Sequence, residues 1–451
     1  TLVRSDNGTI DIKKNLNAEK GGKGNSFSQA TSGGKVVNHS ILKSTLSHFT
    51  GMISYGRSNN HRSSIATNKG TIELAGDSDS NIGMAALNGG EIRNDDGTIK
   101  VLGKGKNKAT IYTDQTSSAT LNGGNYFISG ESSSGIYNQG STILGANNKI
   151  FASNGAVGIY SSGGLVDGSH AANGVDIEVD DGDSEEKGLA VYGENGTDIK
   201  LQNSKINVKK GAAGVAAFGA NTKINLNGTT LKYSGSGYAA YATGGGKIDL
   251  SNSRIELRGR AAGFEMSGSG TSPITLNSGT KIHVYSNDVT VMNIKDMASL
   301  NYSNLNSTAF NSYLQGATVH AENGATDYKL AAVDGIGAYN INSSLDKKLA
   351  VNPANKNTND LDLEDLNNLK HEVMDNGNES AFNKYSKYQL KILRNMMFAE
   401  RGFAFKKGGE MRTYFENKSW YLPTIEDQSE IQLDDYDKQF VLKLKKYEGI
   451  N

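Results

Sequence analysis

The stretch GTDIKLQNSKINVKKGAAGVAAFG (Gly196–Gly219) returns twice in altered form, as NTKINLNGTTLKYSGSGYAAYATG (Asn221–Gly244) and GGKIDLSNSRIELRGRAAGFEMSG (Gly245–Gly268). Each copy combines short aliphatic-polar alternations, a turn of Gly, Asn or Ser, and a patch of Gly, Ala and an aromatic residue. A unit that repeats at a fixed period is typical of a solenoid, in which each repeat packs on its neighbours. The sequence therefore predicts a stacked repeat protein.

Equivalent apolar positions recur about every 25 residues, three times in each unit. The three sets are Ile199, Ile224, Ile248 and Ile274; Ile206, Leu231, Ile255 and Ile282; and Val215, Tyr238, Phe264 and Val289. The alternation around them indicates strands with one buried and one solvent-facing side. Turn pairs such as Asn195-Gly196 supply the positive φ that a sharp bend requires. We expect a mainly β protein, a right-handed parallel β-helix of roughly ten coils.

The composition is compatible with this fold and favours no charged partner. The chain has 55 Gly, only 3 Pro and no Cys, so few residues interrupt a parallel hydrogen-bond ladder. Lys plus Arg and Asp plus Glu are balanced at 47 each, which argues against nucleic acid or an anionic membrane as a partner. No run of apolar residues approaches the ~18 that suggest a membrane-spanning helix. Because residue 1 is Thr, we expect the chain to be a piece of a longer precursor.

The repeat pattern divides the chain into four segments. Residues 1–65 match the unit loosely and are expected to form irregular N-terminal coils, whereas residues 66–345 should form the regular β-helix. Residues 346–382 have the composition of a polar connector, with a short helix near its end. Residues 383–451 have helical periodicity, with helices expected after Ser386, over Glu410–Glu416 and over Asp434–Tyr447. A rod carrying a small C-terminal helical domain is the expected architecture.

The C-terminal segment contains two runs that carry a family resemblance, LKILRNMMFAERGFAF (Leu390–Phe405) and TYFENKSWYLP (Thr413–Pro423). They resemble the YARHG domain, a small module found in extracellular parts of bacterial proteins. The naming motif is altered, because Phe398 replaces its Tyr, Glu400 its first Arg and Arg401 its His. The resemblance implies no particular reaction. The matching positions are Leu393, Arg394, Asn395, Phe398, Ala399, Gly402, Phe405, Tyr414, Phe415, Trp420, Tyr421 and Pro423.

The repeat region resembles the passenger β-helix of type V autotransporter adhesins of Gram-negative bacteria. The resemblance rests on the unit NKGTIELAG (Asn68–Gly76), on the NGG turns at Asn88 and Asn122, and on the AAGVAAF-type patches. It implies a virulence-related rod that is secreted or displayed on the outer membrane surface. Any membrane attachment is then expected to come from a β-barrel anchor that this sequence lacks.

Candidate site residues fall in an acidic loop and in the C-terminal segment. Asp180, Asp181 and Asp183 belong to the densest charge run, and such oxygen-rich loops can bind Ca²⁺, although a solvated loop is the alternative. Trp420, Tyr421, Arg394 and Arg401 are candidate ligand contacts, and core packing is the alternative for the aromatic pair. No convincing catalytic residues and no cofactor site are evident.

Tyr is the commonest aromatic residue, at 20 copies, and six of these tyrosines fall near equivalent coil positions. Outward-facing rings would form a surface for sugar or protein contact, whereas inward-facing rings would be stacked core. The neighbouring Gly and Ala residues leave room for large rings, so core is the preferred interpretation. The six are Tyr112, Tyr137, Tyr160, Tyr192, Tyr238 and Tyr241.

Three functions remain compatible with the sequence. The preferred one is a non-enzymatic adhesin that binds a host or bacterial surface protein or glycan through the rod face, with a contribution from the helical module. The second is a polysaccharide-degrading enzyme that uses carboxylates such as Asp181 and Asp183. The third is a spacer that only holds another domain away from the cell.

Overall fold

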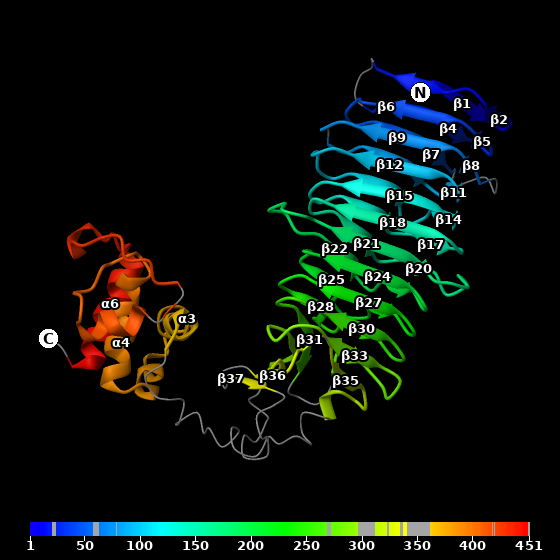
Figure 1. The fold of residues 1–451 in the computed structure, drawn as a ribbon. Helices are drawn as coiled ribbons and strands as arrows, with labels where there is room; N and C mark the ends of the chain where they lie inside the picture. The colour runs from blue at the N-terminus through cyan, green and yellow to red at the C-terminus, as the bar shows by residue number, and fades with distance from the viewer. Residues whose placement is uncertain are drawn as a thin grey trace. The chain divides into compact units, whose positions relative to one another are not determined.

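A computed structural model describes residues 1–19, 24–56, 63–77, 79–267, 272–295, 312–322, 324–333, 337–340, 361–416, 418 and 420–449. The chain separates into two compact units, residues 1–350 and 351–451. The first is a β-solenoid and the second is helical, as expected (Figure 1).

Three parallel sheets run the length of the solenoid, because each coil contributes one strand to each sheet (Figure 1). Strands β1 to β33 form eleven consecutive triplets, since 33 strands divided by three sheets gives eleven coils. At the spacing of ~4.8 Å between paired strands, eleven coils extend about 50 Å. The two sets of aliphatic positions beginning at Ile199 and Ile206 stack in register as predicted.

Within the described residues, sheet A contains fourteen strands, and the last pair is antiparallel. They are β1 (Val3–Asp6), β4 (Ser26–Thr31), β7 (Thr50–Tyr55), β10 (Ile82–Leu87), β13 (Ala109–Thr113), β16 (Ser134–Asn138), β19 (Val157–Ser162), β22 (Leu189–Glu194), β25 (Ala213–Phe218), β28 (Tyr238–Thr243), β31 (Ala262–Ser267), β34 (Thr290–Lys295), β36 (Lys329–Val333) and β37 (Gly337–Asn340).

Sheet B contains eleven short strands. They are β2 (Thr9–Ile12), β5 (Lys35–Asn38), β8 (Ile65–Asn68), β11 (Glu91–Asp95), β14 (Ser118–Asn122), β17 (Ser141–Leu144), β20 (Leu165–Asp167), β23 (Asp198–Lys200), β26 (Lys223–Asn225), β29 (Lys247–Asp249) and β32 (Ile274–Thr275).

Sheet C contains twelve strands. They are β3 (Leu16–Ala18), β6 (Ile41–Ser44), β9 (Thr71–Ala75), β12 (Thr98–Leu102), β15 (Gly124–Ser129), β18 (Asn148–Ser153), β21 (Asp176–Asp180), β24 (Lys205–Lys209), β27 (Thr230–Ser234), β30 (Arg254–Leu257), β33 (Lys281–Val284) and β35 (Thr318–Ala321).

The first coils differ from the expectation of irregular structure in residues 1–65. Strands β1 to β7 already belong to the three sheets and pair in parallel with the coils that follow. Phe27, Val36, Leu42 and Phe49 are buried and extend the same core. The loose sequence match reflects the varied turns between these strands, since the inward positions keep the pattern.

The interior of the solenoid combines stacked aliphatic residues with a polar ladder. Asn38 donates to Asn68 at 2.8 Å, and Asn68 donates to Asn94 at 2.8 Å. Asn94 then donates to the Tyr126 hydroxyl at 2.9 Å, which lies 3.1 Å from the Asn148 side-chain oxygen. All five are essentially inaccessible to solvent, so these bonds satisfy polar groups that burial would otherwise penalise.

The helical unit begins earlier than the sequence predicted. Residues 361–382 were assigned to a polar connector, but Leu361, Leu366, Val373 and Phe382 pack in the core of this unit. The short helix expected near Leu361 to Val373 is present as α3 (Leu363–Lys370), where Asp362 forms a capping box with Asp365. Residues 346–360 of the expected connector lie outside the part of the chain that the structure describes.

The described residues of this unit form seven helical segments. Ser386 caps α4 as predicted, and Phe440, Val441 and Leu444 of α6 face the core. The segments are α3 (Leu363–Lys370), the π-helical η4 (His371–Asp375), the 3₁₀ segment η5 (Glu379–Lys384), α4 (Lys387–Ala399), α5 (Glu410–Glu416), the 3₁₀ segment η6 (Gln428–Glu430) and α6 (Asp435–Glu448).

Candidate ligand-binding face

The strands of sheet A break the simple in-out alternation near their second residue. In β16, Gly135 and Ile136 are both buried, and Tyr137 is half-buried on the outer face. A Cβ added to Gly135 would lie 2.7 Å from the inward side chain of Ile150, so this position also faces the interior. Two consecutive inward residues invert the phase, and the next residue therefore faces outward.

This inversion overturns the prediction that the six tyrosines are stacked core. All six are half-buried on the outer side of sheet A. The third predicted register set is also wrong, because Val215 pairs with Ala240 and not with Tyr238. The small neighbouring Gly and Ala residues, which were the reason for expecting the rings inside, are themselves buried beside them.

The outward rings form a continuous aromatic stack along the solenoid. Tyr112, Tyr137, Tyr160 and Tyr192 are in register on adjacent coils, with ring centroids 4.8 to 5.3 Å apart. Ala216 follows Tyr192 in register, and Phe218 fills the space beside it, 5.2 Å from Tyr192 and 5.6 Å from Tyr241. The stack therefore crosses six coils.

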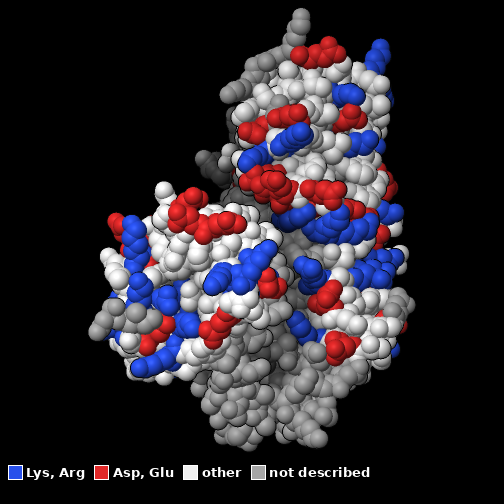
Figure 2. All heavy atoms as spheres, turned by 60° about the vertical axis from the view of Figure 1, so that its left-hand side comes forward, with Lys and Arg blue, Asp and Glu red and all other residues white. Residues whose placement is uncertain are grey.

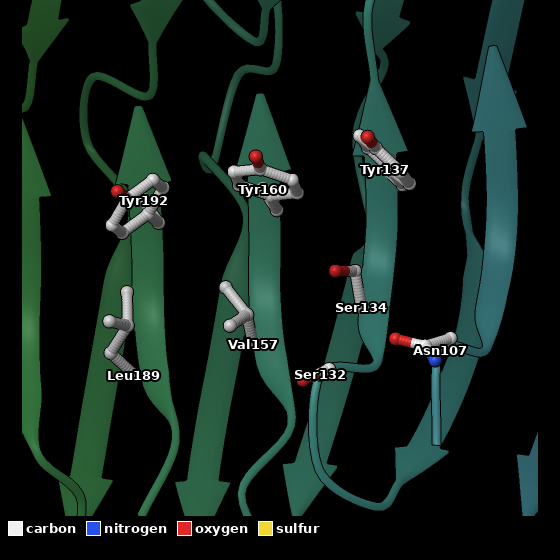
Figure 3. A pocket seen from close by; sticks show the side chains of 8 residues that line it. All are labelled: Asn107, Ser132, Ser134, Tyr137, Val157, Tyr160, Leu189 and Tyr192. Carbon is white, nitrogen blue, oxygen red and sulfur yellow. The ribbon is translucent and has the colours of Figure 1, made fainter. Parts of the chain in front are cut away.

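A groove of about 440 Å³ runs beside three of these tyrosines (Figure 3). Tyr137, Tyr160 and Tyr192 form one row, and Ser134, Val157 and Leu189 form a second row on the same three strands, as Figure 3 shows. Because the rows cross adjacent coils, the groove follows the long axis of the solenoid. Asn107 and Ser132 complete its lining at one end.

The polar groups of this groove differ between its two ends. The hydroxyls of Tyr160 and Tyr192 donate to the two carboxylate oxygens of Glu194, at 2.6 and 3.1 Å. Burial, followed by the Glu194 charge, raises the pKa of Tyr192 to about 12, and burial with the Glu194 hydrogen bond also raises the pKa of Tyr160. Both phenols are therefore protonated donors at neutral pH.

At the opposite end, the side chains of Asn107, Ser132, Ser134 and Tyr137 make no hydrogen bond to other residues in the described part of the chain. An aliphatic wall, aromatic rings and uncommitted amide and hydroxyl groups are suited to binding a molecule with both CH and OH surface. In the same described residues, no group of three or more His, Asp or Glu side chains could hold a metal ion.

The acidic loop does not bring its three aspartates together. Asp181 is buried, and its carboxylate accepts from the Gly155 and Gly188 amides at 2.9 and 2.7 Å. Asp180 lies 3.5 Å from Lys209, and Asp183 pairs with Lys210 at 2.7 Å. Asp181 thus stabilises two turns, whereas the other two are solvated ion-pair members.

The four candidate contacts in the helical unit also have partners within it. Arg394 makes two bonds to Glu448, at 2.7 and 3.2 Å. Arg401 contacts Asp437 and donates to the Met397 carbonyl at 2.7 Å. These arginines link α4 to α6, so their geometry is that of structural ion pairs.

The aromatic pair packs against the same core. Tyr421 is 6% exposed and donates to the Phe403 carbonyl at 2.8 Å. Trp420 is half-buried, and its indole donates to Asp362 at 2.5 Å. The alternative of core packing accounts for Tyr421, whereas Trp420 keeps part of its ring accessible.

Charge is distributed without a dominant sign over the face of the solenoid in Figure 2, where Lys and Arg lie next to Asp and Glu. Many of these side chains pair between neighbouring coils, as Lys43 does with Glu73 at 2.8 Å and Lys209 with Glu178 at 2.8 Å. The aromatic groove of sheet A, by contrast, has no charged side chain among the residues that line it.

Comparison with known proteins identifies the C-terminal unit. Residues 364–449 match the YARHG domain, which confirms the resemblance of this segment. No curated protein matches the chain, and no solved structure matches it. None of the helices in the described residues is long and apolar enough to cross a membrane. A β-helical rod that carries a YARHG domain fits a surface or secreted protein.

Proposed function

We propose that this protein is a non-enzymatic adhesin, secreted or displayed on the bacterial outer surface, that binds a glycan along the aromatic groove of sheet A. The observation that carries the proposal is the row of half-buried tyrosines beside a groove that follows the long axis. Its type V autotransporter origin, with outer-membrane anchoring and a role in virulence, is part of the same proposal.

The ring geometry supports a sugar ligand over a flat apolar partner. Neighbouring ring planes in the groove are inclined by 34° and 55°, so the rings do not cover each other completely. The coil spacing of ~4.8 Å is close to the length of one pyranose unit, so successive sugars in a chain can meet successive tyrosines. CH groups of the sugar would contact ring surface and Leu189 or Val157, while hydroxyls would reach the uncommitted polar end.

Adhesion, in place of catalysis, is supported by the protonation and pairing of the polar groups. Tyr160 and Tyr192 keep their protons at neutral pH, which makes them hydrogen-bond donors and poor general bases. Glu194, the carboxylate nearest to them, already accepts from both hydroxyls. A contribution of the YARHG domain to ligand binding is compatible with the accessible part of Trp420.

Binding to an array of neutral and charged oligosaccharides, followed by calorimetry on the retained ligands, tests the proposal. We expect Tyr160→Ala to weaken glycan binding roughly two- to tenfold, the loss expected for one aromatic contact. Tyr241→Ala is the matched control, because Tyr241 belongs to the same stack but does not line the groove. Tyr241→Ala should lower the stability of the solenoid about as much as Tyr160→Ala does, and it should leave the affinity for the glycan unchanged.

Three results would contradict the proposal. If a Tyr137→Ala and Tyr160→Ala double variant that remains folded by circular dichroism binds as well as wild type, the groove is not the binding site. If any retained polysaccharide yields new reducing ends, and Asp181→Asn or Asp183→Asn abolishes this turnover, the protein is a degrading enzyme. If the protein binds no glycan, and removing coils reduces only the distance at which it holds another domain from the cell, the protein is a spacer.

A further inference from the structure

A second hollow, of about 260 Å³, lies on the outer face of sheet C, and we call it the Phe151 notch. Six outward side chains from β18, β21 and β24 surround it in two rows. One row is Lys149, Asp176 and Lys205, and the other is Phe151, Glu178 and Asn207. The notch shares no residue with the aromatic groove of sheet A.

Phe151 presents an aromatic surface to this notch. Its ring stacks on Phe127 of the preceding coil, with centroids 4.7 Å apart and planes inclined by only 9°. Lys100, one coil further, lies 5.8 Å from the centroid of Phe127. Phe127 therefore covers one face of Phe151, and Glu178 is the next residue in register on the other side of the ring.

The polar groups around the notch are uncommitted, in contrast to the surface beside it. Lys149, Asp176, Lys205 and Asn207 make no side-chain hydrogen bond and no ion pair within 4.0 Å in the described part of the chain. Glu178, by contrast, is held by Lys209 at 2.8 Å. Two ammonium groups and one carboxylate at the notch thus have no ion-pair partner, whereas the second carboxylate, Glu178, is paired with Lys209.

We propose that the Phe151 notch binds an acidic sugar unit, a pyranose that carries a carboxylate. The CH face of the sugar would lie on the exposed part of the half-buried Phe151 ring, and its hydroxyls would donate to Asp176 or accept from the Asn207 amide. The sugar carboxylate would pair with Lys149 or Lys205, which flank Asp176 on the neighbouring coils. An aromatic platform, hydrogen-bonding side chains and unpaired cations are the three elements that such a ligand requires.

Calorimetric titration of the full chain with oligogalacturonate, and with a neutral galacto-oligosaccharide of equal length, tests this site. We expect the uronate to bind more tightly, with affinity falling at high salt because the contact is ionic. The double variant Lys149→Gln and Lys205→Gln should weaken uronate binding roughly three- to tenfold, since each exposed ion pair contributes modestly. Phe151→Ala should weaken it by a comparable factor.

Two controls separate this site from the groove and from general charge effects. Lys100→Gln removes a cation from the same sheet face outside the notch and should leave uronate binding unchanged. Tyr160→Ala should likewise leave it unchanged, so failure of the groove proposal does not decide this one. Equal affinity for the uronate and the neutral chain, or wild-type affinity in the double lysine variant, would overturn the inference. Because both lysines are exposed, that variant remains informative even if Phe151→Ala does not fold.

Discussion

Replacing Asn94 with Ala should open the middle of the solenoid. Asn94 is the centre of the buried polar ladder, where its side-chain oxygen accepts from Asn68 at 2.8 Å. Its amide nitrogen lies 2.9 Å from the Gly97 carbonyl, 3.2 Å from the Gly123 carbonyl and 2.9 Å from the Tyr126 hydroxyl. The substitution removes all four contacts at a site without solvent access.

The expected loss is about 3 kcal/mol of local stability. Three hydrogen atoms make these contacts, two from Asn94 and one from Asn68, and each net bond contributes ~0.5–1.5 kcal/mol. The cost stays near the net value because the partners keep other bonds. Asn68 still donates to the Gly70 carbonyl, and the Tyr126 hydroxyl remains within reach of Gly123 and Asn148.

Hydrogen exchange resolved by peptide is the suitable assay, because a solenoid can open a few coils at a time and a single melting temperature would average over them. A loss of about 3 kcal/mol corresponds to roughly a hundredfold faster exchange, which we expect in β11 and the adjoining strands and not in β28.

Asn125→Ala provides the matched control, because Asn125 lies on the outer side of β15 and makes no side-chain hydrogen bond within the described residues. The local stability that hydrogen exchange reports for this variant should differ from wild type by less than about 0.5 kcal/mol. Equal exchange in the Asn94 and Asn125 variants would refute the claim that the ladder stabilises the coils.

Three further predictions concern buried charges. Burial lowers the pKa of Lys108 from 10.5 to about 8, so between these pH values the folded state holds fewer protons than the unfolded state. The stability measured by hydrogen exchange should therefore rise with pH across this range, and Lys108→Met should abolish that rise. Arg394→Met leaves Glu448 buried without its cation and should cost about 3 kcal/mol, measured through the fluorescence of Trp420, the single Trp of the chain. Asp181→Ala should lower the stability of the solenoid by about 2 kcal/mol, because it removes the acceptor of two turn amides. Ca²⁺ should leave the melting temperature of the wild type unchanged. A rise in that temperature with Ca²⁺ would restore the metal-site hypothesis.

Much of the fold could be predicted because it depends on a period that is visible in one sequence. The aliphatic sets beginning at Ile199 and Ile206 gave two of the three sheets in correct register. The direction of the tyrosines could not be predicted in the same way. It depends on a local irregularity at residues such as Gly135, where two consecutive positions face inward, and the sequence alone does not reveal this irregularity.

The polar ladder and the uncommitted groups of the Phe151 notch were missed for a related reason. Asn38, Asn68 and Asn94 resemble the many turn asparagines of the chain, and only the stacking of coils shows that they meet inside. Lys149 and Lys205 are likewise two of many lysines, and only the register of β18, β21 and β24 shows that they flank Asp176 on sheet C. Contacts between residues on different coils arise from register, so a repeat must be aligned to within one residue before they can be predicted.

The two proposed sites are independent because of how a solenoid is built. Every outward position repeats once per coil and contributes little to the core, so a row of residues on one sheet can change without altering the stacking of Ile, Leu and Val inside. Sheet A uses this freedom for an aromatic row, whereas sheet C uses it for paired charges interrupted by Phe127 and Phe151. A mixed glycan with neutral and acidic units could contact both faces, and avidity would then exceed the affinity of either site if the chain reaches around the rod. A rod with one disrupted site should consequently keep measurable binding to such a glycan, and only loss of both sites should abolish it.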